Sequence, residues 1–461
     1  MHIRRLYSTY LLLTTLCPML WSQQAAAMPL DPHSFASLGV FPTTPGTYQI
    51  DTSKLQFLDP NGTQLFPGVV NEDGIAVFTF GGNTTSSVNI IATGSRPLAL
   101  LFQGDFIYSG TLDVSGNGAD PGPGAGGGGV GGSAANGGVG GMGGGKGGGI
   151  AGSGGSFGGF GGNSGAVNSI VNFTYGDLAT TLLQGGSGGG GGDSGVCVSG
   201  PCPVGGAGGG GGGGIEIGAL GNIEISGFVL AHGGPGGDGI DGSASAGGGG
   251  ASGGGISMHG ATVTFLDSGG LRAAGGFGGN SIDSYGGGGG GGGRVLILTS
   301  AGGTVSGFID VLGGGGGSAV SSPHSGTGQP GQLGVITFGQ LPPEPFPFQG
   351  FFTPVQNPQM VNTVKAGQAI PVKFSLGGDR GLAIFAAGSP ASRSVSCVGF
   401  SGSDPIEETV SAGASSLQYD PETEIYIYVW KTAKNWANTC RMLSLTLTDG
   451  SVHEAFFQFL K

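Results

Sequence analysis

Glycine is concentrated in one part of this chain, and that concentration limits what the chain can fold into. Of the 111 glycines in 461 residues, all but 18 lie between residues 96 and 340. Glycine loses more backbone entropy on folding than any other residue. A region this rich in glycine is therefore ordered only if its backbone segments approach one another closely, and otherwise it stays flexible.

The glycine blocks show a three-residue period. From residue 128 the sequence divides into GGV, GGS, AAN, GGV, GGM and GGG. This period fits extended polyglycine-II-type helices, which have three residues per turn, as polyproline II has. Collagen is excluded, because its strict Gly-X-Y period with abundant proline is absent. Three alternatives stay open: a stacked polyglycine-II array, surface loops on a β-solenoid, and disorder of residues 126–165.

A strand unit repeats between the glycine blocks. Each copy has a strand of alternating apolar residues, a polar turn and a second strand that holds Ser-Gly. The Ser-Gly glycines of the last three copies, Gly227, Gly269 and Gly307, are 42 and 38 residues apart. Such periods predict a β-solenoid or a stacked array, with the strands at 215 and 223 stacked on those at 256 and 295. The four copies span residues 98–118, 215–237, 256–279 and 295–317.

The regions on either side of the glycine-rich domain, residues 96–340, differ from it in composition. Residues 28–95 form a predicted N-terminal β region, with short strands at 74–80 and 87–92. Residues 341–349, LPPEPFPFQ, have four prolines in nine residues, which is typical of a stiff extended linker. Residues 350–461 are again ordinary in composition.

The first 27 residues have the features of a secretory signal peptide. Arg4 and Arg5 precede an apolar run at residues 11–21, and three alanines at 25–27 form a small-residue cleavage site. We therefore expect a mature chain that begins near Met28 and is secreted, either extracellular or associated with the cell surface. No later segment approaches the roughly 18 apolar residues that a membrane helix needs.

The charge of the mature chain excludes some partners. After residue 27 the sequence has 13 Lys and Arg against 27 Asp and Glu, a net charge of −14. This balance argues against nucleic acid and anionic membrane surfaces. Only 9% of the chain is charged, so a large, weakly charged surface is expected, which favours self-association or polysaccharide contact.

Four cysteines follow the signal peptide, an even number that favours disulfides in an exported protein. The short spacing of Cys197 and Cys202 around Gly200-Pro201 favours a local bridge, and Cys397 and Cys440 lie together in the C-terminal region. We prefer these two pairs to the crossed alternatives. Neither pair has the spacing of a zinc site.

Two motifs resemble functional sites. Ser194 lies in GDSG, the tetrapeptide around the nucleophile of chymotrypsin-like proteases, but no histidine has the matching sequence context. Residues 233–241, GGPGGDGID, match one nine-residue calcium repeat with Asp238 as the ligand. The next nine residues carry no Asp, although calcium is held between adjacent turns. Asp238 is therefore a weak calcium candidate, and we expect no cofactor and no catalytic residue.

The C-terminal region has the pattern of a β-sandwich. Residues 424–430, 442–448 and 453–459 alternate between apolar and polar side chains, and Asp449-Gly450 predicts a hairpin. About 110 residues are enough to bury a core of their own. We expect Phe374, Trp430 and Trp436 in that core, with a bridge between Cys397 and Cys440 across it.

The same region resembles the bacterial PxKF domain, which is named for a tetrapeptide that reads Pro371-Val372-Lys373-Phe374 here. The likeness covers nearly all of residues 355–461. It implies an Ig-like unit appended to secreted bacterial proteins of varied kinds, without an established catalytic role. More loosely, the glycine-rich part resembles the repeat regions of large bacterial exported surface proteins.

The sequence therefore predicts an exported all-β protein with a glycine-rich β-solenoid or stacked array followed by an Ig-like sandwich. The leading hypothesis is a non-enzymatic structural or adhesive protein of the cell surface or extracellular matrix. One alternative is a glycan-acting β-helix lyase or hydrolase, which requires Asp238, Asp241, Arg272 and Arg294 to converge. Another is an ice-binding protein, because regular arrays of short polar side chains can order water.

Overall fold

The regular secondary structure of the fold is almost entirely β. The computed structural model describes residues 29–129, 144–145, 151–165, 174–175, 183–194, 204–239, 245–266, 268–282, 284–304, 307–319, 325–341, 343, 345–358, 360–397, 403–405 and 417–461. Within these residues the helical segments are two short 3-10 turns, Pro32–Ser34 and Lys434–Trp436. The predicted all-β class is confirmed. The predicted signal peptide, Cys197, Cys202 and Asp241 lie outside the described residues.

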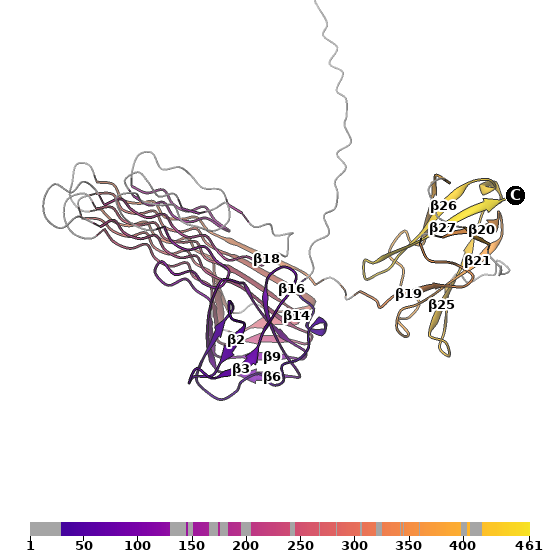
Figure 1. Cartoon of the computed structure of the whole chain (residues 1–461), viewed down its shortest axis with the longest axis horizontal. Helices are drawn as coiled ribbons and strands as arrows, with labels where there is room; N and C mark the ends of the chain where they lie inside the picture. Colours follow the sequence, from indigo (N-terminus) through magenta and orange to yellow (C-terminus); the bar gives the residue numbers. More distant parts are fainter. Residues whose placement is uncertain are drawn as a thin grey trace, which may run out of the picture.

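Two curled sheets enclose the first hydrophobic core (Figure 1). One sheet has the order β17 (Phe308–Asp310), β15 (Gly270–Arg272), β13 (Phe228–Leu230), β10 (Thr111–Asp113), β7 (Asn89–Thr93), β1 (Thr47–Asp51), β2 (Gln56–Leu58) and β3 (Gln64–Pro67). The other has the order β4 (Val69–Val70), β5 (Ala76–Phe80), β8 (Leu98–Phe102), β11 (Gly214–Ala219), β14 (Gly255–Phe265), β12 (Ile223–Ile225), β9 (Phe106–Tyr108) and β6 (Thr84–Ser86). β16 (Arg294–Gly302) pairs with β14, and β18 (Val335–Gln340) pairs with β16.

Successive units stack in parallel and in register. β11 lies between β8 and β14, and Ile215 is opposite Leu98 on one side and Ile256 on the other. β12 pairs with the second half of β14, and β14 pairs with β16, so the predicted stacking of the 215 and 223 strands is confirmed. The sheets run across residue 95 without a break, because β5 pairs with β8 and β7 pairs with β10.

The Ser-Gly pair is a corner between two strands. The sequence predicted that Ser226-Gly227 lies within a second strand, but it separates β12 from β13, so the unit has three strands. A Cβ atom on Gly227 would lie 1.9 Å from the carbonyl oxygen of Gly110 on the neighbouring level. On Gly307 it would lie 2.5 Å from the carbonyl oxygen of Gly269. Glycine recurs at this corner because adjacent levels touch there through their backbones.

The N-terminal end of this stack is closed. The antiparallel strands β1, β2 and β3 extend one sheet, and their rings pack in the core beside those of β5 and β8. Phe41 contacts the rings of Phe57, Phe80 and Phe102 with centroid separations of 4.9–5.9 Å. Aromatic pairs of this kind bury large apolar areas and add specific packing energy. This aromatic cluster fills the end of the core that the repeated strands leave open.

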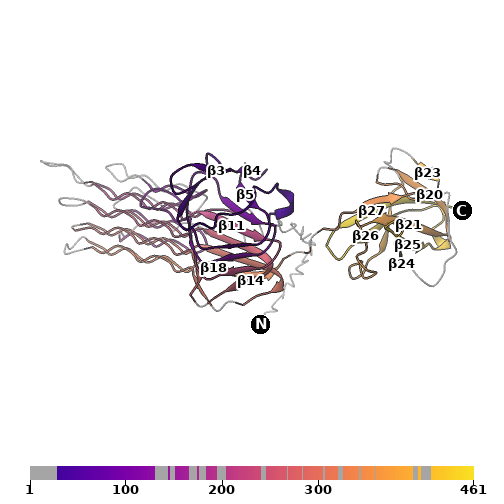
Figure 2. The same cartoon turned by 90° about the horizontal axis from the view of Figure 1, so that it is seen from below.

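The described glycine segments form a hydrogen-bonded array beside the sheets, where Figure 2 shows them as long extended segments running side by side. In residues 246–254, three consecutive N–H groups donate to three different neighbours, and the pattern then repeats. Gly248 and Ala251 donate to the segment 231–237, Gly249 and Ser252 to 187–190, and Gly250 and Gly253 to 288–291, with N···O distances of 2.7–3.0 Å. Each central segment is thereby bonded on several sides at once.

The hydrogen bonds arrange these segments in three layers. The central layer contains residues 205–213, 246–254, 286–293 and 328–334, and one flanking layer contains 114–118, 231–239, 273–280 and 311–318. The other flanking layer contains 126–129, 184–192, 151–155 and 159–165. A Cβ atom on Gly249 would lie 2.0 Å from the carbonyl oxygen of Ser153, and one on Gly250 would lie 2.1 Å from that of Gly276. Only glycine fits at these positions.

The C-terminal region has its own core between two further sheets, seen at the yellow end of the chain in Figure 1. The first sheet contains β19 (Gln349–Phe352), β21 (Ala369–Ser375), β25 (Ile425–Lys431) and β24 (Leu417–Asp420). The second contains β22 (Ala391–Val395), β26 (Cys440–Thr446), β27 (Val452–Leu460), β20 (Val361–Lys365) and β23 (Ser403–Pro405).

Several sequence predictions for this region are confirmed. The three predicted strands correspond to β25, β26 and β27, and Gly450 has a φ of +85° in the turn between the last two. Phe374 and Trp430 are buried, and Trp436 packs against the same core. Cys397 and Cys440 form the predicted disulfide, with a Cα–Cα distance of 5.3 Å. The expected position across the core is wrong, because the bridge links the end of β22 to the neighbouring strand β26 of the same sheet, where Val395 is paired with Cys440.

The end of the proline-rich segment is anchored on this second core. The Phe348 ring stacks on His453 with a centroid separation of 3.5 Å and on Phe374 at 5.5 Å. The Phe346 N–H donates to the carboxylate of Asp449. Burial raises the pKa of Asp449, but hydrogen bonds from Phe346 and Ser451 outweigh that effect and hold the pKa below its usual value.

We predict that Gly249→Ala destabilises the first core and its array by about 2 kcal/mol or more, because the new Cβ overlaps a carbonyl oxygen of the next segment. Thermal unfolding followed by far-UV circular dichroism measures the loss. Gly127→Ala is the matched control, since a Cβ there has no atom within 4 Å. Equal stability of the two variants would contradict the layered array.

We predict that Asp449→Asn lowers the stability of the C-terminal region by about 1–2 kcal/mol at pH 7. A carboxyl whose folded pKa is depressed stabilises the fold above its unfolded pKa of about 3.9, and this contribution is lost as the pH falls through the folded value. The difference between the variant and the parent should therefore shrink from pH 7 to pH 3.

Tryptophan fluorescence reports this transition selectively. Trp430 and Trp436 both belong to the second core, and the third tryptophan, Trp21, lies in the predicted signal peptide. A stability difference that stays constant between pH 7 and pH 3 would show that the charge of Asp449 is unimportant.

Candidate interaction surfaces

The residues that the sequence singled out as possible catalytic or metal-binding residues make contacts within the scaffold. Ser194 is buried, and its N–H donates to the Asp193 carboxylate over 2.8 Å. Asp238 accepts a hydrogen bond from the Asn280 N–H at 2.6 Å, which links two neighbouring glycine segments. Among the described residues, no group of three or more His, Cys, Asp or Glu is placed to hold a metal ion.

The two arginines of the glycan-enzyme alternative lie on different sheets and have different partners. The Arg272 guanidinium on β15 lies between the rings of Phe228 and Phe308, 5.1 and 5.2 Å from their centroids. Arg294, at the start of β16, lies 5.5 Å from the Phe157 ring centroid and donates from Nε to the Tyr175 carbonyl. Cation–π contacts of this kind are structural and hold each arginine in place.

The residues of the C-terminal tetrapeptide motif lie on β21. Pro371 and Phe374 are buried, and Phe374 stacks on Tyr426 with a centroid separation of 5.6 Å. Lys373 is half-buried. Two of the three motif residues are thus buried, and Phe374 belongs to the core of the C-terminal sheets.

The flanking layer with residues 231–239 presents a regular face, which we call the grid face. Three parallel segments lie side by side, linked by bonds such as Gly236 N–H to Phe277 O and Gly278 N–H to Gly315 O. Most of its nine positions are exposed, and Phe277 retains 68% of its accessible surface. Every third residue of each segment belongs to this face: His232, Pro235 and Asp238; Ala274, Phe277 and Asn280; Leu312, Gly315 and Ser318.

The electrostatics of this face are mild. Burial lowers the pKa of His232, while the carboxylates of Asp310 and Asp113 oppose that effect and the Arg272 guanidinium adds to it. His232 Nδ1 accepts the Ala274 N–H, which requires a neutral acceptor nitrogen. Asp238 is the charged residue among the nine positions. The grid face therefore combines apolar, amide and hydroxyl groups with little net charge.

A buried acid–histidine pair lies on the outer side of the second sheet. His259 Nε2 is 3.0 Å from Glu216 Oε1, and both side chains are about 4% exposed. The same carboxylate oxygen accepts the Leu30 N–H at 2.7 Å, which ties the N-terminal segment to β11. A Cβ atom on Gly218 would lie 2.3 Å from the His259 ring, so this glycine makes room for the imidazole.

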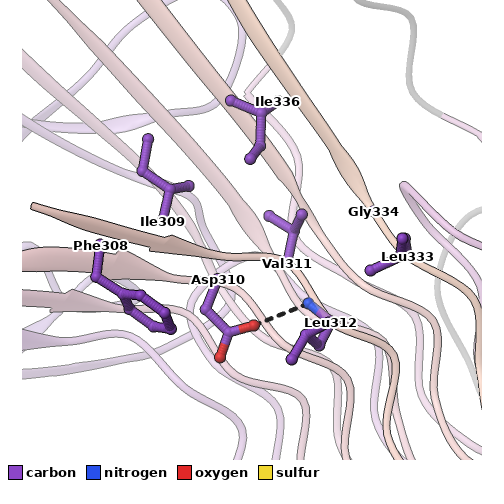
Figure 3. Close-up of a pocket in the computed structure, with 8 residues that line it drawn as sticks. All are labelled: Phe308, Ile309, Asp310, Val311, Leu312, Leu333, Gly334 and Ile336. Carbon is purple, nitrogen blue, oxygen red and sulfur yellow. Dashed lines mark hydrogen bonds between the residues drawn. The ribbon is translucent and has the colours of Figure 1, made fainter. Parts of the chain in front are cut away.

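The last level of the stack, which we call the open end, is apolar. It consists of β17, β18 and the glycine segments that adjoin them, and it has a hollow of about 420 Å³. Figure 3 shows Val311, Leu333 and Ile336 around this hollow. Phe308, Leu312, Leu333, Ile336 and Phe338 are 38–63% exposed.

Sequence reasoning missed the grid face, the Glu216–His259 pair and the open end. The grid face had a signal, because non-glycine residues recur every third position in residues 232–238. The other two had none, since they depend on which strands become neighbours. The part of the chain that the structure describes contains no helix with the length and hydrophobicity needed to span a membrane.

The chain was compared with protein families, curated proteins and solved structures. No family model, curated protein or solved structure matches it.

We predict that Glu216→Ala destabilises the first core by about 2–3 kcal/mol, because it leaves the buried His259 ring and the Leu30 N–H without their acceptor. Glu216→Gln should cost less, since its amide oxygen can still accept the Leu30 N–H. Calorimetry of the parent and of the two Glu216 variants measures the loss of stability, and limited proteolysis near residue 30 measures the release of the N-terminal segment. Glu224→Ala on β12, which is partly exposed, is the control and should be close to neutral.

Proposed function

We propose that this chain is an exported, non-enzymatic structural or adhesive protein of the cell surface or extracellular matrix. In this proposal the stacked strand units act as a short β-solenoid, and the glycine segments act as a polyglycine-II-type slab. The C-terminal sheets are an Ig-like PxKF-type module appended to that slab. The grid face is the surface that contacts polysaccharide.

The observation that carries the proposal is the bonding of the glycine segments. Their N–H groups point in turn to three different neighbouring segments, and carbonyl oxygens lie within about 2 Å of the positions a Cβ would occupy. Such an array is rigid and flat, because every segment is held by its neighbours on several sides. A flexible spacer needs none of these bonds.

The composition of the grid face suits a weakly charged glycan. A pyranose ring has an apolar C–H face and a rim of hydroxyl groups, so it is matched by exposed apolar side chains beside short polar ones. Phe277, Pro235 and Leu312 supply the exposed apolar side chains. Asn280 supplies an amide group and Ser318 a hydroxyl group.

The spacing and charge narrow the substrate class. Successive grid positions on one segment are about 9 Å apart, given a rise of about 3.1 Å per residue, which is on the scale of two linked sugar rings. The chain carries a net charge of −12, and that charge disfavours anionic polymers. We therefore propose a neutral, extended polysaccharide as the contact.

We predict that the purified protein is retained on at least one insoluble neutral polysaccharide, such as cellulose or an insoluble glucan. Phe277→Ala should reduce the retained fraction severalfold, because it removes the most exposed ring of the grid face. Leu382→Ala in the C-terminal region, which is 59% exposed, is the matched control and should bind as the parent does.

The same assay on anionic polysaccharides tests the charge argument. Retention there that equals or exceeds retention on neutral polymers would contradict the proposed substrate class. Absence of retention on all polymers would remove the glycan contact from the proposal.

A further inference from the structure

The open end interrupts columns of core residues that continue through the rest of the stack. One column contains Leu98, Ile215, Ile256 and Val295, which are at most 2% exposed, and it ends at Ile336, which is 38% exposed. A second column contains Leu100, Ile217, Met258 and Ile297, at most 3% exposed, and ends at Phe338, which is 58% exposed. Ile336 and Phe338 occupy core positions that the next level would cover.

The backbone at this end is also without a further neighbour in the sheets. β17 is the terminal strand of the first sheet, and β18 pairs only with β16 among the described strands. An edge strand presents a row of N–H and C=O groups that can pair with another chain. Lysine, which often blunts such edges, is absent from residues 335–340.

We infer that the open end is the contact surface for a second copy of this chain, paired with the first about a two-fold axis. The opposite end of the stack is closed by β1, β2 and β3 and their aromatic cluster. That end also finishes in edge strands, β3 and β4, but its core is covered, since Phe41 and Phe57 are at most 1% exposed. The uncovered core level that can meet the open end is therefore the same open end of the partner. Such self-complementary pairing produces a closed dimer.

The charge of this surface permits the pairing. Residues 307–319 and 325–340 contain one charged side chain, Asp310, although the whole chain has a net charge of −12. The Asp310 carboxylate accepts the Leu312 N–H at 2.9 Å, as Figure 3 shows. Two open ends can meet without a dense concentration of like charges.

The direction of the strands also permits it. A two-fold axis perpendicular to the strands makes the facing strands antiparallel. The glycine array already contains antiparallel neighbours, because Gly249 donates to Gly190 and Ser252 donates to Ser187, so the array accepts either direction. Antiparallel pairing of two β18 strands is equally compatible with sheet geometry.

This inference extends the proposed structural role, on which its biological purpose rests, but it uses a different surface from the grid-face residue Phe277. A dimer joined at the open ends would double the length of the slab and place two grid faces in one particle. The first core would then be continuous between the two copies.

Sedimentation velocity and light scattering over a concentration series test this inference on the chain from residue 28 onward. We expect a monomer–dimer equilibrium with no larger species. Phe338→Glu, and separately Leu333→Glu, should weaken the dimer at least tenfold, since each puts two carboxylates at an apolar contact. Val69→Glu on β4, 51% exposed at the closed end, is the matched control and should leave it unchanged.

Several outcomes would overturn the inference: a monomer at all concentrations, open-ended oligomers, or a dimer that Val69→Glu weakens as much as Phe338→Glu. Circular dichroism confirms that each variant keeps its fold. Because Phe338→Glu and Leu333→Glu change different residues, a loss of the dimer in both cannot come from a local distortion at one position. The polysaccharide assay separates the two proposals. A monomeric protein that still binds polysaccharide refutes the dimer alone, and a dimer without retention refutes the glycan contact alone.

Discussion

Direct backbone-to-backbone contact between glycine segments is the interaction on which the first part of this structure depends. The carbonyl oxygens of one segment occupy the space that the β-carbons of the next would need. The segments are also continuous with the strands: β13 leads directly into residues 231–239, and residues 246–254 lead directly into β14. The array and the sheets must therefore keep a common spacing, and a disturbance in one is transmitted to the other.

Because the backbones are so close together, functional side chains can be accommodated only at the surfaces of this part of the structure. Inside the array there is little room for functional groups, and in the sheets the inward positions are filled by aliphatic and aromatic residues. The polar residues that the sequence suggested for catalysis or metal binding serve the scaffold: Asp238 links two segments, and Arg272 lies between two rings. The first part of the molecule therefore exposes a weakly charged grid face and an apolar end.

The C-terminal sheets are held together by side-chain packing instead of backbone contact. Their core is built from large side chains, with Phe374, Tyr426 and Trp430 packed against residues of β26 and β27, and a disulfide joins Cys397 to Cys440. The end of the proline-rich segment is bound to this core through Phe346 and Phe348. Alternating side chains carry the information for such a fold, and its strands were accordingly predicted well.

The sequence by itself determined several of the strands, the stacking of the repeats and the pairing of Cys397 with Cys440, because these follow from local alternation, period and the position of the cysteines. It misplaced the Ser-Gly pair within a strand, since alternation does not distinguish a corner from a bulge. Tertiary structure alone decided how the glycine blocks are arranged, because glycine has no side chain to indicate its neighbours. It also decided that Glu216 meets His259 and that Ile336 and Phe338 are exposed, because both depend on which strands adjoin and where the stack stops.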